Sequence, residues 1–142
     1  MKNCRFLSLF VTIGLAILLT PAVGRAGLPV EAGAALYVAG LNGTINVFSP
    51  DGAGSTFADT DDGLNHPYGI AFDSLGNLYV SDFVQNHIVK FTPDGSSSVF
   101  ADGSDGVSHP GGIAFDAAGN LFAADIGNNR ILKFTPDGAA SV

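Results

Sequence analysis

Short apolar runs separated by turn residues dominate the chain after residue 26. In the best-defined stretch the runs fall at residues 69–73, 77–82, 87–92 and 97–102, and they are rich in Ile, Val, Phe and Tyr. Ser-Leu-Gly and Pro-Asp-Gly lie between them, and these are turn sequences because Pro presets φ and Gly accepts positive φ. Runs of this length and composition predict β-strands, and none of this part shows the period of a capped helix. The pattern therefore predicts an all-β domain.

The strand pattern repeats along the chain. The segment that begins at His66 matches the segment that begins at His109 without a gap, at an offset of 43 residues. A weaker copy lies upstream, where residues 36–52 match residues 78–95 with one residue deleted. A period of about 40–45 residues is typical of β-propeller blades, which are four-stranded antiparallel sheets arranged around an axis. We therefore predict blades at residues 36–58 (partial), 66–102 and 109–142.

The repeat resembles a known family. Residues 112–138, GIAFDAAGNLFAADIGNNRILKFTPDG, resemble an NHL repeat, and GNNRI is close to the usual start of the third strand in that family. The resemblance covers most of residues 36–142 and implies a six-bladed propeller in the superfamily of gluconolactonase-like enzymes and lyases. Because propellers of this kind include binding modules, lyases and sensors, the fold alone does not select a function.

The number of repeats is smaller than a closed propeller needs. Residues 27–142 hold about 2.7 repeats at the observed period, whereas closed propellers have at least four blades. Residues 139–142 correspond to residues 96–99, inside a repeat. We therefore expect an incomplete propeller that is the N-terminal part of a longer protein. Self-association through the open sheet edges is the alternative.

The first 26 residues follow a different pattern. Lys2 and Arg5 precede an almost uninterrupted apolar run at residues 6–23, and Gly24-Arg25-Ala26 places small residues at a cleavage site. This layout predicts a cleavable signal peptide at residues 1–26 and an exported product, which is secreted, periplasmic or held at the cell surface. A membrane anchor is the alternative, because about 18 apolar residues approach the length that spans a bilayer.

Cleavage of the signal peptide changes the charge of the protein. The whole chain has six basic and thirteen acidic residues, and removal of residues 1–26 leaves three basic residues and a net charge of −10. It also removes the sole cysteine, Cys4. Since a strongly acidic protein repels polyanions, we expect no nucleic-acid partner and no membrane partner after cleavage.

Two acidic loops are the candidate metal sites. Residues 59–63 are DTDDG and residues 102–106 are DGSDG. Calcium takes several carboxylate and carbonyl oxygens from a flexible turn, but neither loop has the full twelve-residue calcium pattern. We favour solvated turns over calcium ligands for these loops. The calcium candidates are Asp59, Asp61, Asp62, Asp102 and Asp105.

A second group of polar and aromatic side chains is expected at one end of the blades. The loop entering the first strand of a blade shares that end with the loop between its second and third strands, which predicts ligand-face positions for His66, Tyr68, Asp82, His109 and Asp125. Two histidines on one face are chemically able to bind zinc or exchange protons. However, in the NHL-like lyases that the repeat resembles, the zinc histidines follow the proline, where Tyr68 and Gly111 stand here. We interpret both histidines as loop-packing residues, and both aspartates as structural because they recur with the blade.

The sequence contains no nucleophile elbow, no phosphate-binding loop and no Cys/His metal spacing. We therefore favour a binding module for a protein, glycan or small-molecule ligand over an enzyme. One alternative is a metal-dependent lyase or lactonase whose catalytic residues lie in blades beyond this chain. The other is a fragment without an activity of its own.

Overall fold

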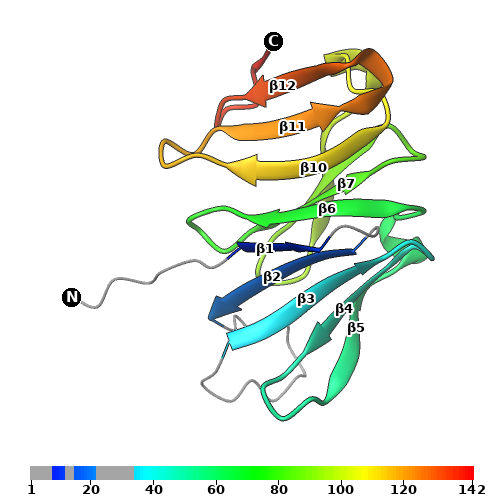
Figure 1. Ribbon diagram of the computed structural model, residues 1–142, viewed down its shortest axis with the longest axis vertical. Coiled ribbons are helices and arrows are strands. Elements are labelled where there is room, and N and C mark those ends of the chain that lie inside the picture. The colour runs from blue at the N-terminus through cyan, green and yellow to red at the C-terminus, as the bar shows by residue number, and fades with distance from the viewer. Residues whose placement is uncertain (1–7, 12–14, 22–33) are drawn as a thin grey trace.

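Three antiparallel sheets lie one against the next along the length of the molecule in the computed structural model, which describes residues 8–11, 15–21 and 34–142 (Figure 1). The first sheet contains β1 (Ser8–Val11), β2 (Leu15–Pro21), β3 (Ala34–Gly40), β4 (Thr44–Phe48) and β5 (Gly54–Ala58). The second contains β6 (Pro67–Phe72), β7 (Leu78–Asp82), β8 (His87–Phe91) and β9 (Ser97–Ala101). The third contains β10 (Pro110–Phe115), β11 (Leu121–Asp125), β12 (Arg130–Phe134) and β13 (Ala140–Ser141).

The predicted fold class is confirmed. The strands of the second sheet begin and end within two residues of the four apolar runs, and each follows its neighbour in an up-and-down order. The described residues contain three short 3₁₀ helices, η1 (Thr60–Asp62), η2 (Gly103–Asp105) and η3 (Ile126–Asn128). None of these helices is long and apolar enough to cross a membrane.

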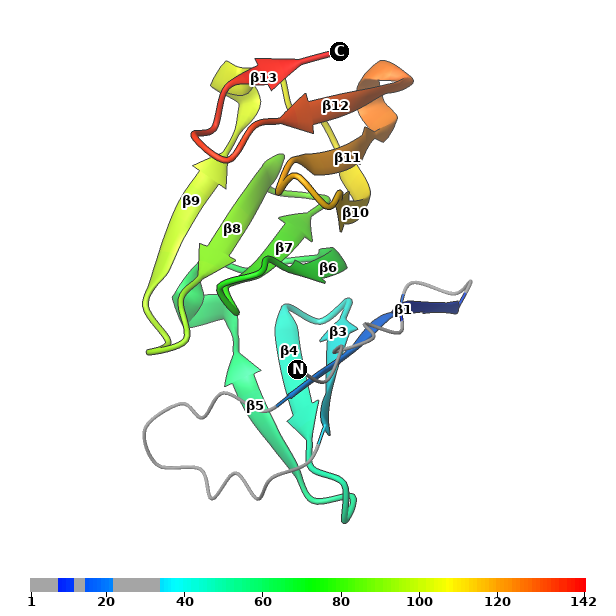
Figure 2. The ribbon, with the colours of Figure 1, turned by 90° about the vertical axis from the view of Figure 1, so that its left-hand side faces the viewer.

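Two strands of the first sheet, β1 and β2, come from the predicted signal segment. Ile17 of β2 lies opposite Val38, just as Ile70 of β6 lies opposite Val80, so β2 pairs with β3 as β6 pairs with β7. Figure 2 shows β3, β4 and β5 below the second sheet in the same order as β7, β8 and β9. The cleavage and export of residues 1–26 stay predictions.

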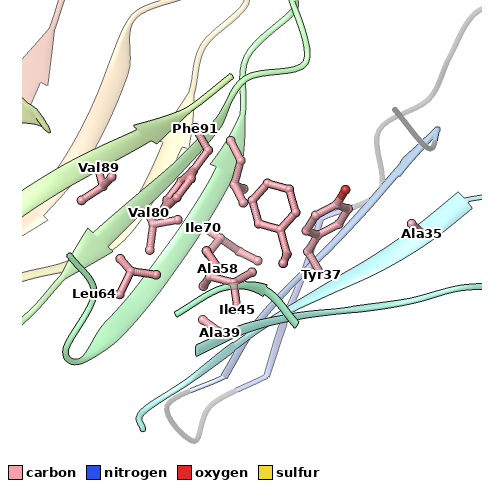
Figure 3. Close-up of a cluster of buried hydrophobic side chains, with 12 residues drawn as sticks. Ala35, Tyr37, Ala39, Ile45, Ala58, Leu64, Ile70, Val80, Val89 and Phe91 are labelled. Carbon is pink, nitrogen blue, oxygen red and sulfur yellow. The ribbon is translucent and has the colours of Figure 1, made fainter. Parts of the chain in front are cut away.

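The core consists of two apolar layers, one between each two neighbouring sheets. Figure 3 shows the first layer, where side chains of the first sheet meet Ile70, Val80 and Phe91 of the second. Tyr37 stands edge-on to Phe57 and Phe72, with ring centroids 5.3 and 5.0 Å apart. The second layer repeats this arrangement, with Tyr79 edge-on to Phe100 and Phe115 at 5.0 and 4.9 Å. Each such pair contributes about 0.5–1.5 kcal/mol beyond its buried area, so the aromatic contacts help to fix how one sheet docks on the next.

Candidate functional site

The loops that enter β6 and β10 lie at the same end of the molecule as the β7–β8 and β11–β12 connections, on the right in Figure 1. We call this end the loop face, and the opposite end, which carries the tight turns, the turn face. The structure places all five predicted ligand-face residues at the loop face. They separate into two groups, one exposed or half-buried and one fully buried, and only the first group is accessible to a ligand.

The first group surrounds Phe83, a residue that the sequence analysis did not select. The ring centroid of Phe83 lies 6.4 Å from that of His66, 6.1 Å from that of Tyr68 and 4.9 Å from that of His109. His66 precedes the second sheet and Tyr68 belongs to it, whereas His109 precedes the third sheet. Phe83 therefore joins two blades at the loop face. The sequence does carry a signal for it, because the two other copies have aliphatic Leu41 and Ile126 at this position.

His109 is held in an unusual backbone conformation. Its φ is +49°, in the left-handed region that costs a non-glycine residue about 1 kcal/mol or more. Its backbone N–H donates to Asn86 Oδ1 at 2.7 Å, and Asn86 itself has φ +56°. Pro110, the next residue, is fully buried. The Asn86 amide and the anchored proline hold the His109 ring beside Phe83.

The exposed surface extends from this cluster to its two sides. Tyr68, Val84 and Ile126 are 37%, 49% and 47% exposed. Ile126 adjoins the cluster. Its Cδ1 lies 2.6 Å from the place of a Cβ on Gly111, and His109 Nδ1 lies 2.9 Å from the place of a Cβ on Gly127, the residue after Ile126. We call this surface the loop-face patch, and it consists of His66, Tyr68, Phe83, Val84, His109 and Ile126.

Asp82 lies beneath the patch and has no exposed surface. Its Oδ2 accepts the backbone N–H groups of Asn65 and His66 at 2.6 and 2.9 Å. Its Oδ1 accepts those of Val84 and Gln85 at 3.2 and 3.0 Å. A buried carboxylate is stable only with such donors. Asp82 therefore shapes both loops that carry the patch, and its oxygens point into the protein.

Asp125 occupies the equivalent position in the third sheet with a different set of donors. It accepts the Ser108 N–H at 2.7 Å, the Asn128 side-chain amide at 2.9 Å and Arg130 Nε at 2.7 Å. Burial raises the pKa of Asp125, but the hydrogen bonds from Asn128, Arg130 and Ser108 lower it more, so its pKa lies below the ordinary value. Arg130 also donates to Gly106 O at 2.8 Å, which ties η2 to the third sheet.

The acidic loops form capping boxes around η1 and η2. Asp59 accepts the N–H of Asp61 at 2.9 Å, and Asp62 accepts the N–H of Asp59 at 3.1 Å. Asp102 and Asp105 repeat the arrangement around η2, at 2.8 and 3.0 Å. Calcium needs six to eight converging oxygens, whereas these carboxylates bind their own loops. In the part of the chain that the structure describes, no three His, Cys, Asp or Glu side chains gather as a metal site.

A separate hollow of about 390 Å³ lies between the inner strands β6 and β10 toward the turn face. Asp73 at its edge accepts the N–H groups of Leu75 and Asn77, and Asp116 accepts those of Ala118 and Asn120. Both carboxylates are therefore engaged in their own turns. The apolar lining of the hollow includes Ile70, Phe72, Ile113 and Phe115.

No protein-family model and no curated protein matches this chain. Among solved structures, it is similar to virginiamycin B lyase from Staphylococcus aureus, with a TM-score of 0.65 and 19% identity over 89% of this chain and 40% of that chain. It is similar to a chain of the nidogen/laminin complex, with a TM-score of 0.66 and 26% identity over 75% and 42%. It is also similar to the calcium-binding protein regucalcin from Agrobacterium tumefaciens, with a TM-score of 0.67 and 19% identity over 91% and 45%.

These likenesses and the stacked four-stranded sheets define the class of the protein as a β-propeller with an incomplete set of blades. The chain spans less than half the length of these solved chains. At such identities the likeness concerns the fold.

Proposed function

We propose that this protein is an exported, NHL-like propeller module that binds another protein through the loop-face patch. The observation that carries the proposal is a group of exposed and half-buried aromatic and aliphatic side chains, without an Asp, Glu, Lys or Arg residue, at the loop end of two adjoining blades. Exposed apolar patches that are rimmed by polar residues commonly mark interaction sites.

The residue types favour a protein partner. Tyr, Phe and other large apolar side chains form the centres of protein interfaces, from which charged residues are depleted. Exposed acids lie on η1 and η2 at the same end, including Asp61, Asp102 and Asp105. A partner that fits this surface has an apolar centre and a basic rim, because complementary charges steer association and fix its orientation.

The test uses a displayed library of random peptides selected on the immobilised chain. We expect selected peptides to combine aromatic and basic residues, and to lose binding at least about tenfold with Phe83→Ser or Ile126→Ser. The matched control is Leu75→Ser, which removes a side chain that is 79% exposed at the turn face. A glycan array run in parallel separates the alternatives. Glycan binding without peptide binding, or peptides that bind the Phe83 variant equally well, would overturn the proposal.

Calcium is a separate question at the same end of the molecule. Regucalcin, a structural relative, is described as calcium-binding, and the acidic loops of this chain are its candidate cation sites. Four of their five carboxylates, those of Asp59, Asp62, Asp102 and Asp105, already accept backbone N–H groups. We therefore expect calorimetry with calcium chloride to show no stoichiometric micromolar site. A stoichiometric micromolar site that is lost in Asp102→Asn would show that the capping boxes open to bind the ion.

A further inference from the structure

The loop-face patch contains two groups that can change charge near neutral pH. Of its six residues, only His66 and His109 are of a type that titrates between about pH 5 and pH 8. Both rings lie beside Phe83, with centroids 6.4 and 4.9 Å from that of the phenyl ring. Because the patch has no Asp, Glu, Lys or Arg, these two imidazoles set its charge.

The backbone fixes the positions of both histidines. The His66 N–H donates to Asp82 Oδ2 at 2.9 Å, and Asp82 is fully buried. The His109 N–H donates to Asn86 Oδ1 at 2.7 Å. A fully buried proline, Pro67 or Pro110, follows each histidine. Since the backbone is anchored at both positions, a partner that packs on Phe83 meets both imidazoles.

The charged groups of the surrounding loops are engaged elsewhere. Asp82 and Asp125 are buried and accept backbone N–H groups of the loops that carry the histidines. Arg130 binds Asp125 at 2.7 Å, and this is the one ion pair among the residues that the structure describes. All but one of the acids in the two acidic loops accept backbone N–H groups there. These acids are Asp59, Asp61, Asp62, Asp102 and Asp105.

The imidazole of His109 has one polar neighbour. Its Nδ1 lies 3.2 Å from Ser108 Oγ. A hydroxyl can donate to a neutral ring or accept from a charged one, so this contact is compatible with either charge state. Among the described residues neither histidine has a carboxylate partner. A positive charge on either ring would therefore be unpaired once a partner displaces the water around it.

We propose that protonation of His66 and His109 releases the protein partner from the loop-face patch, an inference that rests on the proposed function. Histidine is ordinarily neutral above about pH 7, and the patch then offers an uncharged, largely apolar surface. Acidification adds up to two positive charges around Phe83. Burying an unpaired charge against an apolar partner is costly, and these charges also repel the basic rim of the partner. The loop face therefore binds its partner at neutral pH and releases it in acid.

The test measures the affinity of a selected peptide that contains no histidine, at about pH 7.5 and about pH 5.5 and at constant ionic strength. Ordinary carboxylates and the basic groups of the peptide keep their charge over this range. We expect the dissociation constant to rise about tenfold or more on acidification, because each histidine that must be neutral in the complex contributes up to about tenfold. Circular dichroism at both pH values shows that the chain stays folded.

The variants separate the two patch histidines from the third histidine of the chain. His66→Gln with His109→Asn removes both charges, and Asn tolerates the left-handed backbone of residue 109, where φ is +49°. This double variant is expected to bind with the same dissociation constant at both pH values. His87→Gln is the matched control, since His87 lies in β8 outside the patch, and it is expected to keep the wild-type pH dependence. A double variant with wild-type pH dependence would overturn the inference.

A second measurement needs the wild type alone. Calorimetry at about pH 6.5 in two buffers of different ionisation enthalpy counts the protons that binding releases or takes up. We expect release, because binding selects neutral imidazoles. Proton uptake, no proton exchange, or equal or tighter binding in acid would overturn the inference and leave the proposed function standing. A selection that yields no peptide dependent on Phe83 would overturn the proposed function, and this inference with it.

Discussion

Two buried aspartates support the loop face with different donors. Asp82 accepts hydrogen bonds from four backbone N–H groups, two in the loop before β6 and two in the loop after β7. Asp125 receives one backbone N–H together with the side chains of Asn128 and Arg130. Both carboxylates are hydrogen-bonded within the protein. We therefore attribute their recurrence in the repeat to a structural role in the loops rather than to a reaction.

Asp125→Ala tests this structural role. The change leaves Ser108 without an acceptor and Arg130, whose side chain is 33% exposed, without its carboxylate. We expect a loss of about 1–3 kcal/mol, which is typical when a buried hydrogen bond loses one partner. Urea unfolding followed by circular dichroism measures the loss. Asp137→Ala, in an exposed turn at the opposite end, is the matched control and is expected to change stability much less. Equal losses in the two variants would contradict the role given to Asp125.

The pH dependence of stability follows from the same residue. The folded-state pKa of Asp125 lies below its ordinary value. The stability it contributes is therefore present above the unfolded pKa of about 4, and it is lost as the pH falls through the folded pKa. We expect Asp125→Asn to flatten the loss of stability between about pH 5 and pH 3 relative to the wild type. Urea midpoints measured across this range give the comparison, and parallel curves would exclude a contribution from Asp125.

At the scale of elements, the inner strands β6 and β10 approach each other unusually closely. Ser81 Oγ accepts the Gly69 N–H at 2.8 Å and donates to Gly111 O at 2.6 Å, so one hydroxyl bridges two blades. The contact requires a glycine, because a Cβ on Gly69 would lie 2.7 Å from Gly111 O. The other two sheets have Ala39 and Ala124 at the position of Ser81, so this bridge belongs to the junction of the second and third sheets.

Gly69→Ala is expected to push β6 and β10 apart and to destabilise the protein by about 1–3 kcal/mol through overpacking. Gly112→Ala, in β10, is the control because a Cβ there meets nothing within 4 Å. Thermal unfolding of the two variants gives the comparison. A melting temperature for Gly69→Ala equal to that of the control would show that the strands are further apart than described.

For the whole molecule, the sequence predicts the strands that recur with each repeat, but it does not predict the contacts between one repeat and the next. Alternation and turn residues place the strands of the second sheet within two residues. The repeat also brings His66 and His109 to one end, but their meeting at Phe83 depends on the angle between two sheets, which no spacing reveals. Likewise the pattern of residues 6–23 predicts a signal peptide and gives no sign of the pairing between β2 and β3, because an uninterrupted apolar run carries no strand register.

The central claim is that the loop face binds a partner. Hydrogen–deuterium exchange with and without a selected peptide tests it most directly, because protection is measured along the whole described chain at once. The account predicts slower exchange on binding at residues 64–68, 83–86, 107–111 and 126–129, and unchanged exchange in the turns at residues 73–76 and 116–120. Protection confined to those turns, or to the hollow between β6 and β10, would contradict it.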